Sequence, residues 1–338
     1  MSAPIRIGLL GVGRIGRMHA RLIAGGEVPG LELSVVYDID ADAAQAVSTS
    51  LGVGIASSAE ELMSSSTTDA VAICTSADTH IDLLVTATAI GKPVFLEKPV
   101  SLDLAEVDRG LAAAERASLF LQVGFNRRFD PAHASVREAI ASGEVGELHL
   151  VRISSRDPAP PPLEYIRVSG GIFLDMTVHD FDMARFVTGT EVGEVYALGD
   201  VRVDPEIGEA ADLDTAVVTL RHADRVLTVI DNSRRAVYGY DQRVEAFGSA
   251  GMTASHNPLV HTGTVSTESG TRTQPLPHFF VERYIPSYVA QWGAFERAVR
   301  AGAPPPVTAE DGRAALVLGL AAWRSVHEGR TVRTAEIG

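Results

Sequence analysis

Cysteine is almost missing from this sequence: Cys74 is the only one among 338 residues. An intrachain disulfide is therefore excluded, which is typical of proteins from a reducing cytoplasm. Long apolar runs are missing too, since none reaches the eighteen or so residues that a membrane span needs. The first residues also lack the basic stretch and uninterrupted apolar core of a secretory signal peptide, so we expect none. These absences predict a cytoplasmic protein.

Positive charge is scarce beside negative charge. The sequence has 29 Lys and Arg against 43 Asp and Glu, a formal net charge of −14. This balance argues against nucleic acids and anionic membrane surfaces as partners. Spacings typical of metal sites, such as HExxH or paired Cys and His, are lacking as well, so we expect no metal. The length suffices for about two domains with sizeable cores.

The clearest motif is a glycine triplet, Gly11-x-Gly13-x-x-Gly16, between an apolar run at 5–10 and helix-compatible sequence. Gly11 allows a sharp turn after the strand, Gly13 allows a pyrophosphate to approach the backbone, and Gly16 allows the helix to pack close. The helix N-terminus would then face the phosphates. A glycine-rich structural turn is the alternative interpretation, and the surrounding strand–helix pattern argues against it. The motif predicts a dinucleotide site.

Asp38 indicates which dinucleotide binds. It follows a second apolar run at 32–37, where a carboxylate accepts hydrogen bonds from ribose hydroxyls and repels a 2′-phosphate. Residues 39–42 supply no arginine to offset that repulsion. We therefore expect NAD as the cofactor, rather than NADP.

Residues 1–124 alternate regularly between strand and helix patterns. This alternation predicts an α/β domain of the Rossmann type, with a doubly wound parallel sheet that binds NAD. The expected strands are 5–10, 32–37, 70–74, 93–96 and 119–124, and the expected helices are 15–24, 42–51, 79–90 and 104–117.

Residues 125–338 lack the regular strand–helix alternation of the first 124 residues. Their pattern predicts an α+β domain for substrate binding and oligomerisation. Its strands, mostly within 193–255, alternate apolar and polar positions, which is typical of a large, mostly antiparallel open sheet. We expect helices at about 131–142, 171–188, 281–301 and 309–328, and a proline-rich loop at 157–165. The open sheet face favours a homo-oligomer, a dimer or tetramer.

Lys98 stands at the end of the fourth expected strand, in PVFLEKP. Ligands of doubly wound sheets bind outside the carboxyl ends of the strands, so Lys98 would point toward the cofactor cleft. Pro99 restricts the backbone before it and would fix the direction of the lysine, with a cis bond as one way to do so. An ordinary solvated surface lysine is the alternative.

Asp175 and His179 are four residues apart in an expected helix, so both side chains would share one face. A histidine oriented by a carboxylate is a suitable general base near neutral pH. A core histidine beside an acid that complements the helix dipole is the alternative. A metal site formed by His179, Asp180 and Asp182 is a minor alternative, because no metal-ligand spacing supports it.

Two further groups stand out in the second half. Arg127, in Gly-Phe-Asn-Arg-Arg-Phe at 124–129, would either hydrogen-bond polyol hydroxyls or pair with an acid across the domain interface. Tyr240 lies between two expected strands, where a loop role is the default.

Taken together, these motifs resemble the glucose–fructose oxidoreductase/inositol dehydrogenase (Gfo/Idh/MocA) family, along essentially the whole chain. The matching segments are GVGRIG, Glu97-Lys98-Pro99, QVGFNRRF from Gln122, and Gly171-x-x-x-Asp175-x-x-x-His179-x-x-Asp182. Within the family, GGIFLDMTVHDFDMARF and YGYDQRVEAFGSAGM look most like bacterial inositol 2-dehydrogenases.

The resemblance implies roles for specific residues. The catalytic residues would be Lys98, Asp175 and His179. The residues lining the NAD site would be Gly11, Gly13, Arg14, Ile15, Asp38, Thr75, His80, Glu97, Lys98 and Gln122. Those facing the polyol substrate would be Asn126, Arg127, Asp157 and Tyr240.

The implied activity is the NAD-dependent oxidation of a cyclic polyol, myo-inositol to 2-keto-myo-inositol, by hydride transfer. His179 would be the general base and Lys98 would stabilise the developing alkoxide, although the reverse assignment of the base is open. Another inositol isomer or an aldose is the alternative substrate within the family. A sugar-sensing regulator without enzymatic activity is the alternative outside it, and the intact Lys98, Asp175 and His179 argue against that.

Overall fold

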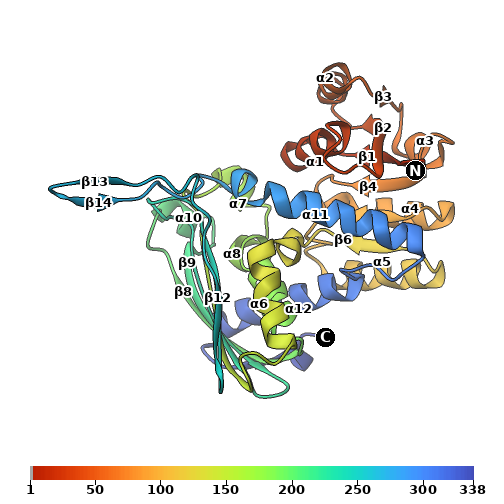
Figure 1. Cartoon of the computed structure of the whole chain (residues 1–338). Helices are drawn as coiled ribbons and strands as arrows, with labels where there is room; N and C mark the ends of the chain where they lie inside the picture. The colour runs from red at the N-terminus through yellow and green to blue at the C-terminus, as the bar shows by residue number, and fades with distance from the viewer. Residues whose placement is uncertain (1–2) are drawn as a thin grey trace. The chain divides into compact units, whose positions relative to one another are not determined.

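The computed structural model describes residues 3–338, which form two compact units (Figure 1). The first unit runs through Asn126 and also contains Tyr288–Ala314, and the second contains Arg127–Ser287 and Ala315–Gly338. The chain therefore returns to its first unit at Tyr288–Ala314. A single boundary between residues 124 and 125 would assign this segment to the second domain. The division into domains 1–124 and 125–338 remains a prediction.

The first unit is a parallel sheet between two layers of helices, as expected for a Rossmann fold. The strand order is β3-β2-β1-β4-β5-β6, and every neighbouring pair is parallel. Its strands are β1 (Ile5–Leu10), β2 (Leu31–Tyr37), β3 (Gly54–Ile55), β4 (Ala70–Ile73), β5 (Val94–Leu96) and β6 (Leu121–Val123). Its helices are α1 (Arg14–Ala24), α2 (Ala41–Leu51), α3 (Ala59–Ser64), α4 (His80–Ile90) and α5 (Leu104–Arg116), with a 3-10 turn, η1, at Ala77–Thr79.

Most of these elements lie where the periodicity predicts them, but β3 and α3 were not predicted. β3 has two residues, both exposed, and α3 has six, so neither carries a long apolar pattern. Ser58 begins α3 by accepting a hydrogen bond from the Glu61 backbone, as an ordinary N-cap does.

Helix α11 (Phe280–Ala301) contributes aromatic side chains to the first unit from Tyr288 onward. The rings of Trp292 and Phe95 lie 4.3 Å apart between centroids, and Phe295 meets both rings edge-on. All three side chains are fully buried. The core beside β5 is thus completed by residues almost two hundred positions later in the chain.

The second unit has a seven-stranded sheet in the order β12-β11-β7-β10-β9-β8-β15, antiparallel except for the β7–β10 pair. This confirms the expected large, mostly antiparallel sheet. The strands are β7 (Leu148–Arg156), β8 (Val192–Asp200), β9 (Thr215–His222), β10 (Leu227–Ser233), β11 (Asp241–Gly248), β12 (Gly251–Ser255) and β15 (Val332–Arg333). The helices are α6 (Pro131–Ala141), α7 (Leu163–Ile166), α8 (Gly171–Asp175), α9 (Val178–Thr188) and α10 (Pro205–Glu209), with a 3-10 turn η3 (Thr334–Glu336). Helix α12 (Ala309–Glu328) belongs to this unit from Ala315 onward, and the 3-10 turn η2 (Asn126–Phe129) from Arg127 onward.

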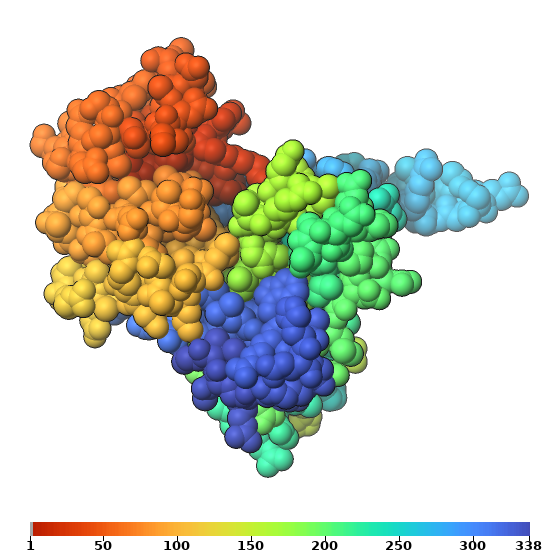
Figure 2. Space-filling view, turned by 180° about the vertical axis from the view of Figure 1, so that it is seen from behind, coloured from red at the N-terminus to blue at the C-terminus, as the bar shows by residue number. Residues whose placement is uncertain are grey.

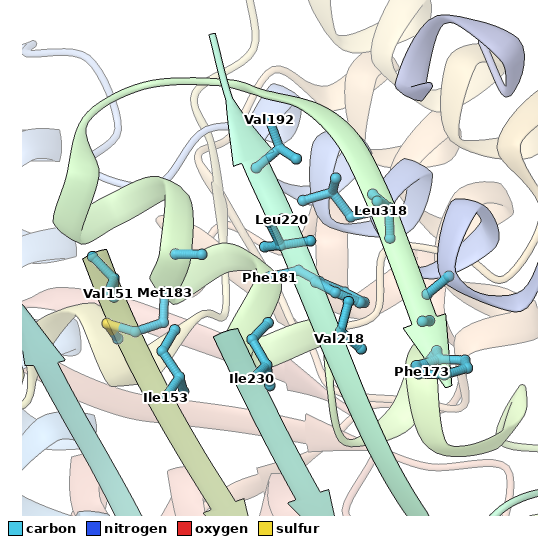
Figure 3. Close-up of a cluster of buried hydrophobic side chains, with 14 of the residues drawn as sticks. Val151, Ile153, Phe173, Phe181, Met183, Val192, Val218, Leu220, Ile230 and Leu318 are labelled. Atoms are coloured by element: carbon cyan, nitrogen blue, oxygen red, sulfur yellow. The ribbon is translucent and has the colours of Figure 1, made fainter. Parts of the chain in front are cut away.

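One face of this sheet carries the core. Side chains such as Ile153, Val218 and Ile230 point from the strands toward Phe181 and Leu318 on the helices (Figure 3). The opposite strand positions leave large apolar side chains exposed, namely Leu198, Val217, Leu227, Phe247 and Met252. A hairpin of β13 (Val265–Thr267) and β14 (Gly270–Arg272) projects from this unit, as both views show (Figures 1 and 2).

The helix expected at 171–188 is two helices, so that prediction was wrong in one respect. α8 ends at Asp175 and α9 begins at Val178. Thr177 lies between them, and its hydroxyl contacts both the Ile172 carbonyl (3.2 Å) and the Asn232 side-chain oxygen (2.6 Å). A threonine hydroxyl that competes for a backbone carbonyl in this way bends or interrupts a helix.

Among residues 3–338, no helix is both long enough and apolar enough to cross a membrane.

Candidate active site

The glycine loop after β1 is packed too tightly for larger residues. Gly11 has a φ of +86°, and a Cβ there would lie 2.6 Å from the Cys74 carbonyl oxygen and the Thr75 nitrogen. A Cβ on Gly16 would lie 1.8 Å from the Gly11 carbonyl oxygen. The first and third glycines therefore permit the close packing of loop, helix and β4 that the motif predicts.

The second glycine has a different environment. A Cβ on Gly13 would meet no atom within 4 Å. Gly13 is also the N-cap of α1, whose first turn has neither a side-chain cap nor an acidic residue. Arg14 and Ile15 form the start of that turn. An uncapped helix N-terminus beside open space fits the pyrophosphate of a dinucleotide.

Asp38 lies directly beside this loop. Its carboxylate accepts hydrogen bonds from the Val12 backbone N–H (2.6 Å) and the Asp40 backbone N–H (2.9 Å), and the side chain is partly exposed. Two backbone donors thus hold the carboxylate at the carboxyl end of β2, where ribose hydroxyls would reach it. The neighbouring Ile39 is 94% exposed and leaves room for a larger side chain.

The carboxyl ends of β4 and β5 carry the next group of predicted residues. Lys98 is partly exposed, and its peptide bond to Pro99 is cis. His80 is buried, and its ring nitrogens lie 2.9 Å from the Pro99 carbonyl oxygen and 3.2 Å from that of Thr75. Burial lowers the pKa of His80. The His80 ring therefore lies between the two loops that carry Thr75 and Lys98, and a neutral ring donates its one N–H to one of the two carbonyls.

Gln122 and Asn126 are buried. Gln122 lies in β6 and is paired in register with Phe95, and its side-chain amide has no hydrogen-bond partner among residues 3–338. Asn126 begins η2. Their roles toward cofactor and substrate remain predictions.

In the second unit, Asp175 is held by two side chains that the sequence analysis did not single out. Tyr165 donates to one carboxylate oxygen (2.9 Å) and Arg234 to the other (3.3 Å). Arg234 is fully buried and also bonds Asp212 (3.2 Å). Tyr165 lies in the proline-rich segment just before α8, a position that could have indicated its role. Arg234 had no comparable signal, because it comes from the end of β10.

His179 is the second residue of α9 and is partly exposed. Because Asp175 ends α8, the inference that one continuous helix places both side chains on one face was wrong. The catalytic roles of Asp175 and His179 remain predictions.

Arg127 forms a buried ion pair. Its guanidinium donates to Asp180 (2.7 Å), to Ser155 (3.0 Å) and to the Tyr240 hydroxyl (3.3 Å). Asn232 occupies the other Asp180 oxygen (2.8 Å). Arg127 therefore pairs with an acid, as one of its two interpretations held, but that acid belongs to the same unit.

Asp182 is similarly paired with Arg128, at 2.6 Å. Asp180 and Asp182 thus both pair with arginine, which does not favour the minor metal interpretation. Among residues 3–338, no group of three or more His, Cys, Asp or Glu side chains is arranged to hold a metal ion.

Asp157 is the least satisfied carboxyl of this region. It directly follows β7, and its backbone bonds Ser233 and Ala236, but its carboxyl makes no hydrogen bond to residues 3–338. Burial, reinforced by the nearby charge of Asp175, raises the pKa of Asp157 to about 6, against the opposing effect of Arg127 and Arg234. A ligand with hydroxyl donors would satisfy it.

Comparisons with known proteins assign the family. Residues 5–125 match the oxidoreductase family with an NAD-binding Rossmann fold, and residues 133–254 match the GFO/IDH/MocA C-terminal domain. The chain belongs to the Gfo/Idh/MocA family. This family is one of NAD-binding oxidoreductases, and the glycine loop and Asp38 fit that cofactor.

The similarity to individual members extends over the full length. The chain is 48% identical to the myo-inositol 2-dehydrogenase of Thermotoga maritima, covering 98% of this chain and 99% of that protein. It is 43% identical to the inositol 2-dehydrogenase of Rhizobium meliloti, with the same coverage. The structure of scyllo-inositol dehydrogenase from Lactobacillus casei with bound NAD(H) and scyllo-inositol superimposes with a TM-score of 0.91 at 28% identity, covering 98% and 99% of the two chains.

The position of Asp38 predicts that it controls cofactor choice. Replacing Asp38 with Ser and Ile39 with Arg should weaken NADH binding by roughly 10- to 100-fold, because a hydrogen bond to a charged group contributes about 1.5–3 kcal/mol. NADPH binding should strengthen. The dissociation constants are measured by nicotinamide fluorescence. In the control, Ile39→Arg alone, the carboxylate still repels the 2′-phosphate. A wild-type protein that prefers NADPH would contradict the prediction.

The environment of Asp157 predicts a gain in stability when its charge is removed. The pKa of this carboxyl is higher in the folded state than in the unfolded chain, so the folded state holds more protons between about pH 4 and 6. The free energy of unfolding therefore decreases as the pH rises through that window and Asp157 loses its proton. Asp157→Asn should raise the melting temperature at pH 7.5 more than at pH 4.5.

The matched control is Asp224→Asn. Asp224 is exposed, and its side-chain oxygen accepts a hydrogen bond from the Val226 backbone that an asparagine would keep. Its melting temperature should follow the wild type at both pH values. A lower melting temperature of Asp157→Asn at pH 7.5 would contradict the prediction, because it would mean that the charged carboxylate stabilises the folded state.

Proposed function

We propose that this enzyme oxidises a secondary hydroxyl of a cyclic polyol, converting myo-inositol to 2-keto-myo-inositol with NAD. The observation that carries the proposal is the polar cluster of the second unit around Asp157 and Asp175. Full-length similarity to proteins named myo-inositol 2-dehydrogenase and inositol 2-dehydrogenase supports this choice of substrate.

The cluster has the chemistry that a polyol requires. Asp157 offers a carboxyl without a hydrogen-bond partner among residues 3–338, and Asp175 is already held at both oxygens by Tyr165 and Arg234. Each hydroxyl of a polyol both donates and accepts a hydrogen bond. Carboxylates accept from such hydroxyls strongly, since charge-assisted hydrogen bonds are about twice as strong as neutral ones. Tyr240, beside Arg127, would face the same hydroxyls.

The chemical step separates the alcohol into a proton and a hydride. When bound, NAD accepts the hydride from the carbon that carries the reacting hydroxyl. His179 removes the hydroxyl proton as general base. The ammonium group of Lys98 hydrogen-bonds the reacting oxygen and stabilises the negative charge that develops there. Asp175 orients the imidazole and binds a neighbouring hydroxyl.

The proposal includes a homo-oligomer, a dimer or tetramer, in the cytoplasm. The exposed apolar positions of the second sheet, which include Leu198, Phe247 and Met252, form the surface that a second copy would cover. The cytoplasmic location rests on the single cysteine.

A substrate panel tests the function. The purified protein is mixed with NAD or NADP and with myo-inositol, scyllo-inositol or glucose, and the absorbance of the reduced nicotinamide is followed. We expect the highest kcat/KM with myo-inositol and NAD, and an inosose as the product by mass spectrometry. A higher value for glucose would indicate an aldose dehydrogenase. Tight NADH binding without any turnover would indicate a sensor.

Variants of Lys98 and His179 test the mechanism. Lys98→Met keeps the apolar stem but removes the charge, so kcat should fall about 10²–10³-fold. His179→Ala should lower kcat by about 10²-fold or more with little change in NADH affinity. Wild-type oxidation should rise with pH as the base loses its proton, and Lys98→Met should need a still higher pH.

The control is Lys92→Met. Lys92 donates to the carbonyl oxygens of Met63 and Ser65 at the end of α3, so this variant should lose stability and keep its turnover. Because groups that act together are not additive, the double variant of Lys98 and His179 should be scarcely slower than the worse single one. Near-normal turnover of Lys98→Met at neutral pH would show that this lysine is a surface residue.

A further inference from the structure

A buried chain of hydrogen bonds leads from the α11 helix to Lys98. Trp292 donates its indole N–H to His19 Nδ1 (2.9 Å), His19 Nε2 lies 2.8 Å from Glu97 Oε1, and Glu97 Oε2 accepts the Lys98 backbone N–H (3.0 Å). Trp292 and His19 are fully buried and Glu97 is 6% exposed. All four residues belong to the first unit.

The partners fix the tautomer of His19. An indole N–H is only a donor, so His19 Nδ1 must be the acceptor and carry no proton. The ring proton is therefore on Nε2, which donates to Glu97. Rings of Phe95, Tyr288 and Trp292 meet His19 edge-on and hold its plane.

Glu97 is the link to the active site. Both its oxygens accept hydrogen bonds, one from His19 and one from the backbone of Lys98. The carboxylate lies against Gly124, where a Cβ would come within 2.9 Å of Oε1. These contacts restrict the Glu97 side chain, and its carboxylate in turn holds the Lys98 backbone N–H.

We propose that His19, held as the Nε2–H tautomer by Trp292, is a positioning residue for Lys98 and acts through Glu97. The proposal rests on the proposed function of Lys98. A polar chain within an aromatic layer carries a desolvation cost that apolar side chains would avoid. We infer that the chain is retained because it orients Lys98.

Glu97→Gln provides a sharp test, because an amide has only one acceptor oxygen. The introduced amide would face two donors, His19 Nε2–H and the Lys98 backbone N–H, so one of its own N–H groups must oppose a donor. Trp292 prevents His19 from changing tautomer. We expect kcat with myo-inositol to fall by roughly tenfold or more, the effect of one unmatched buried hydrogen-bonding group.

Adding Trp292→Phe should partly rescue this defect. Phenylalanine lacks the N–H, so His19 is free to carry its proton on Nδ1 and to accept a hydrogen bond from the introduced amide at Nε2. The double variant should recover kcat by about threefold or more over Glu97→Gln, because both residues contact His19 and changes within one hydrogen-bond network are not additive. The control is Glu97→Gln with Phe295→Leu, which disturbs the same aromatic cluster without changing a hydrogen bond and should show no recovery.

A spectroscopic readout makes the test independent of substrate. The sequence has two lysines, Lys92 and Lys98. Reductive ¹³C-methylation of the folded protein therefore gives two lysine NMR signals beside that of the N-terminal amine, and Lys92→Arg assigns them. The Lys98 signal should shift in Glu97→Gln and return toward its wild-type position with Trp292→Phe, while the Lys92 signal stays unchanged.

A second pair of variants covers the event that Glu97→Gln does not fold. His19→Gln keeps an N–H donor for Glu97 and should retain most of the Lys98 signal position and kcat, whereas His19→Leu should lose both. Equal behaviour of the two His19 variants, or no rescue by Trp292→Phe, would overturn the proposal. A wild-type protein that oxidises no inositol refutes the proposed function instead, and the Lys98 signal still tests the positioning.

Discussion

Parallel pairing of the strands in the first unit is the constraint on which the cofactor site depends. Parallel strands end at one edge, and β1, β2, β4 and β5 therefore deliver the glycine loop, Asp38, Thr75 and Lys98 to that edge. Buried groups lie behind these loops: the His80 ring lies between the backbone carbonyls of Thr75 and Pro99, and Glu97 connects the Lys98 backbone to His19 in the aromatic layer. Residues far apart in sequence therefore lie at one edge of the sheet, because the parallel pairing places the ends of these strands together.

The second unit contains several carboxylates, those of Asp157, Asp175 and Asp180, close enough to influence one another. A buried charge is costly unless it is paired and hydrogen-bonded. Asp180 is paired with Arg127, and Asp175 with Arg234 and Tyr165, whereas Asp157 is left without a hydrogen bond among residues 3–338 and has a raised pKa. We propose that this incompletely satisfied carboxyl accepts hydrogen bonds from hydroxyl groups of the substrate.

The family comparisons and the geometry answer different questions. Similarity over the whole chain assigns the Gfo/Idh/MocA family and its NAD-binding fold. The geometry separates the residues of the shared motifs by what they do. In the segment from Asp175 to Asp182, the two acids Asp180 and Asp182 hold arginines inside the unit, whereas Asp175 and the partly exposed His179 are proposed to act on substrate.

The sequence by itself determined the Rossmann unit, because the glycine triplet, the strand-end Asp38 and the strand–helix alternation are local patterns with one common structural solution. Tertiary structure alone decided what has no local signal. Between α8 and α9, the Thr177 hydroxyl contacts Asn232 in β10, and Asp175 is paired with Arg234, which follows the same distant strand. Trp292 likewise donates a hydrogen bond to His19, 273 residues earlier in the chain. The sequence gives no local signal for such contacts, because they form only where the folded chain brings the partners together.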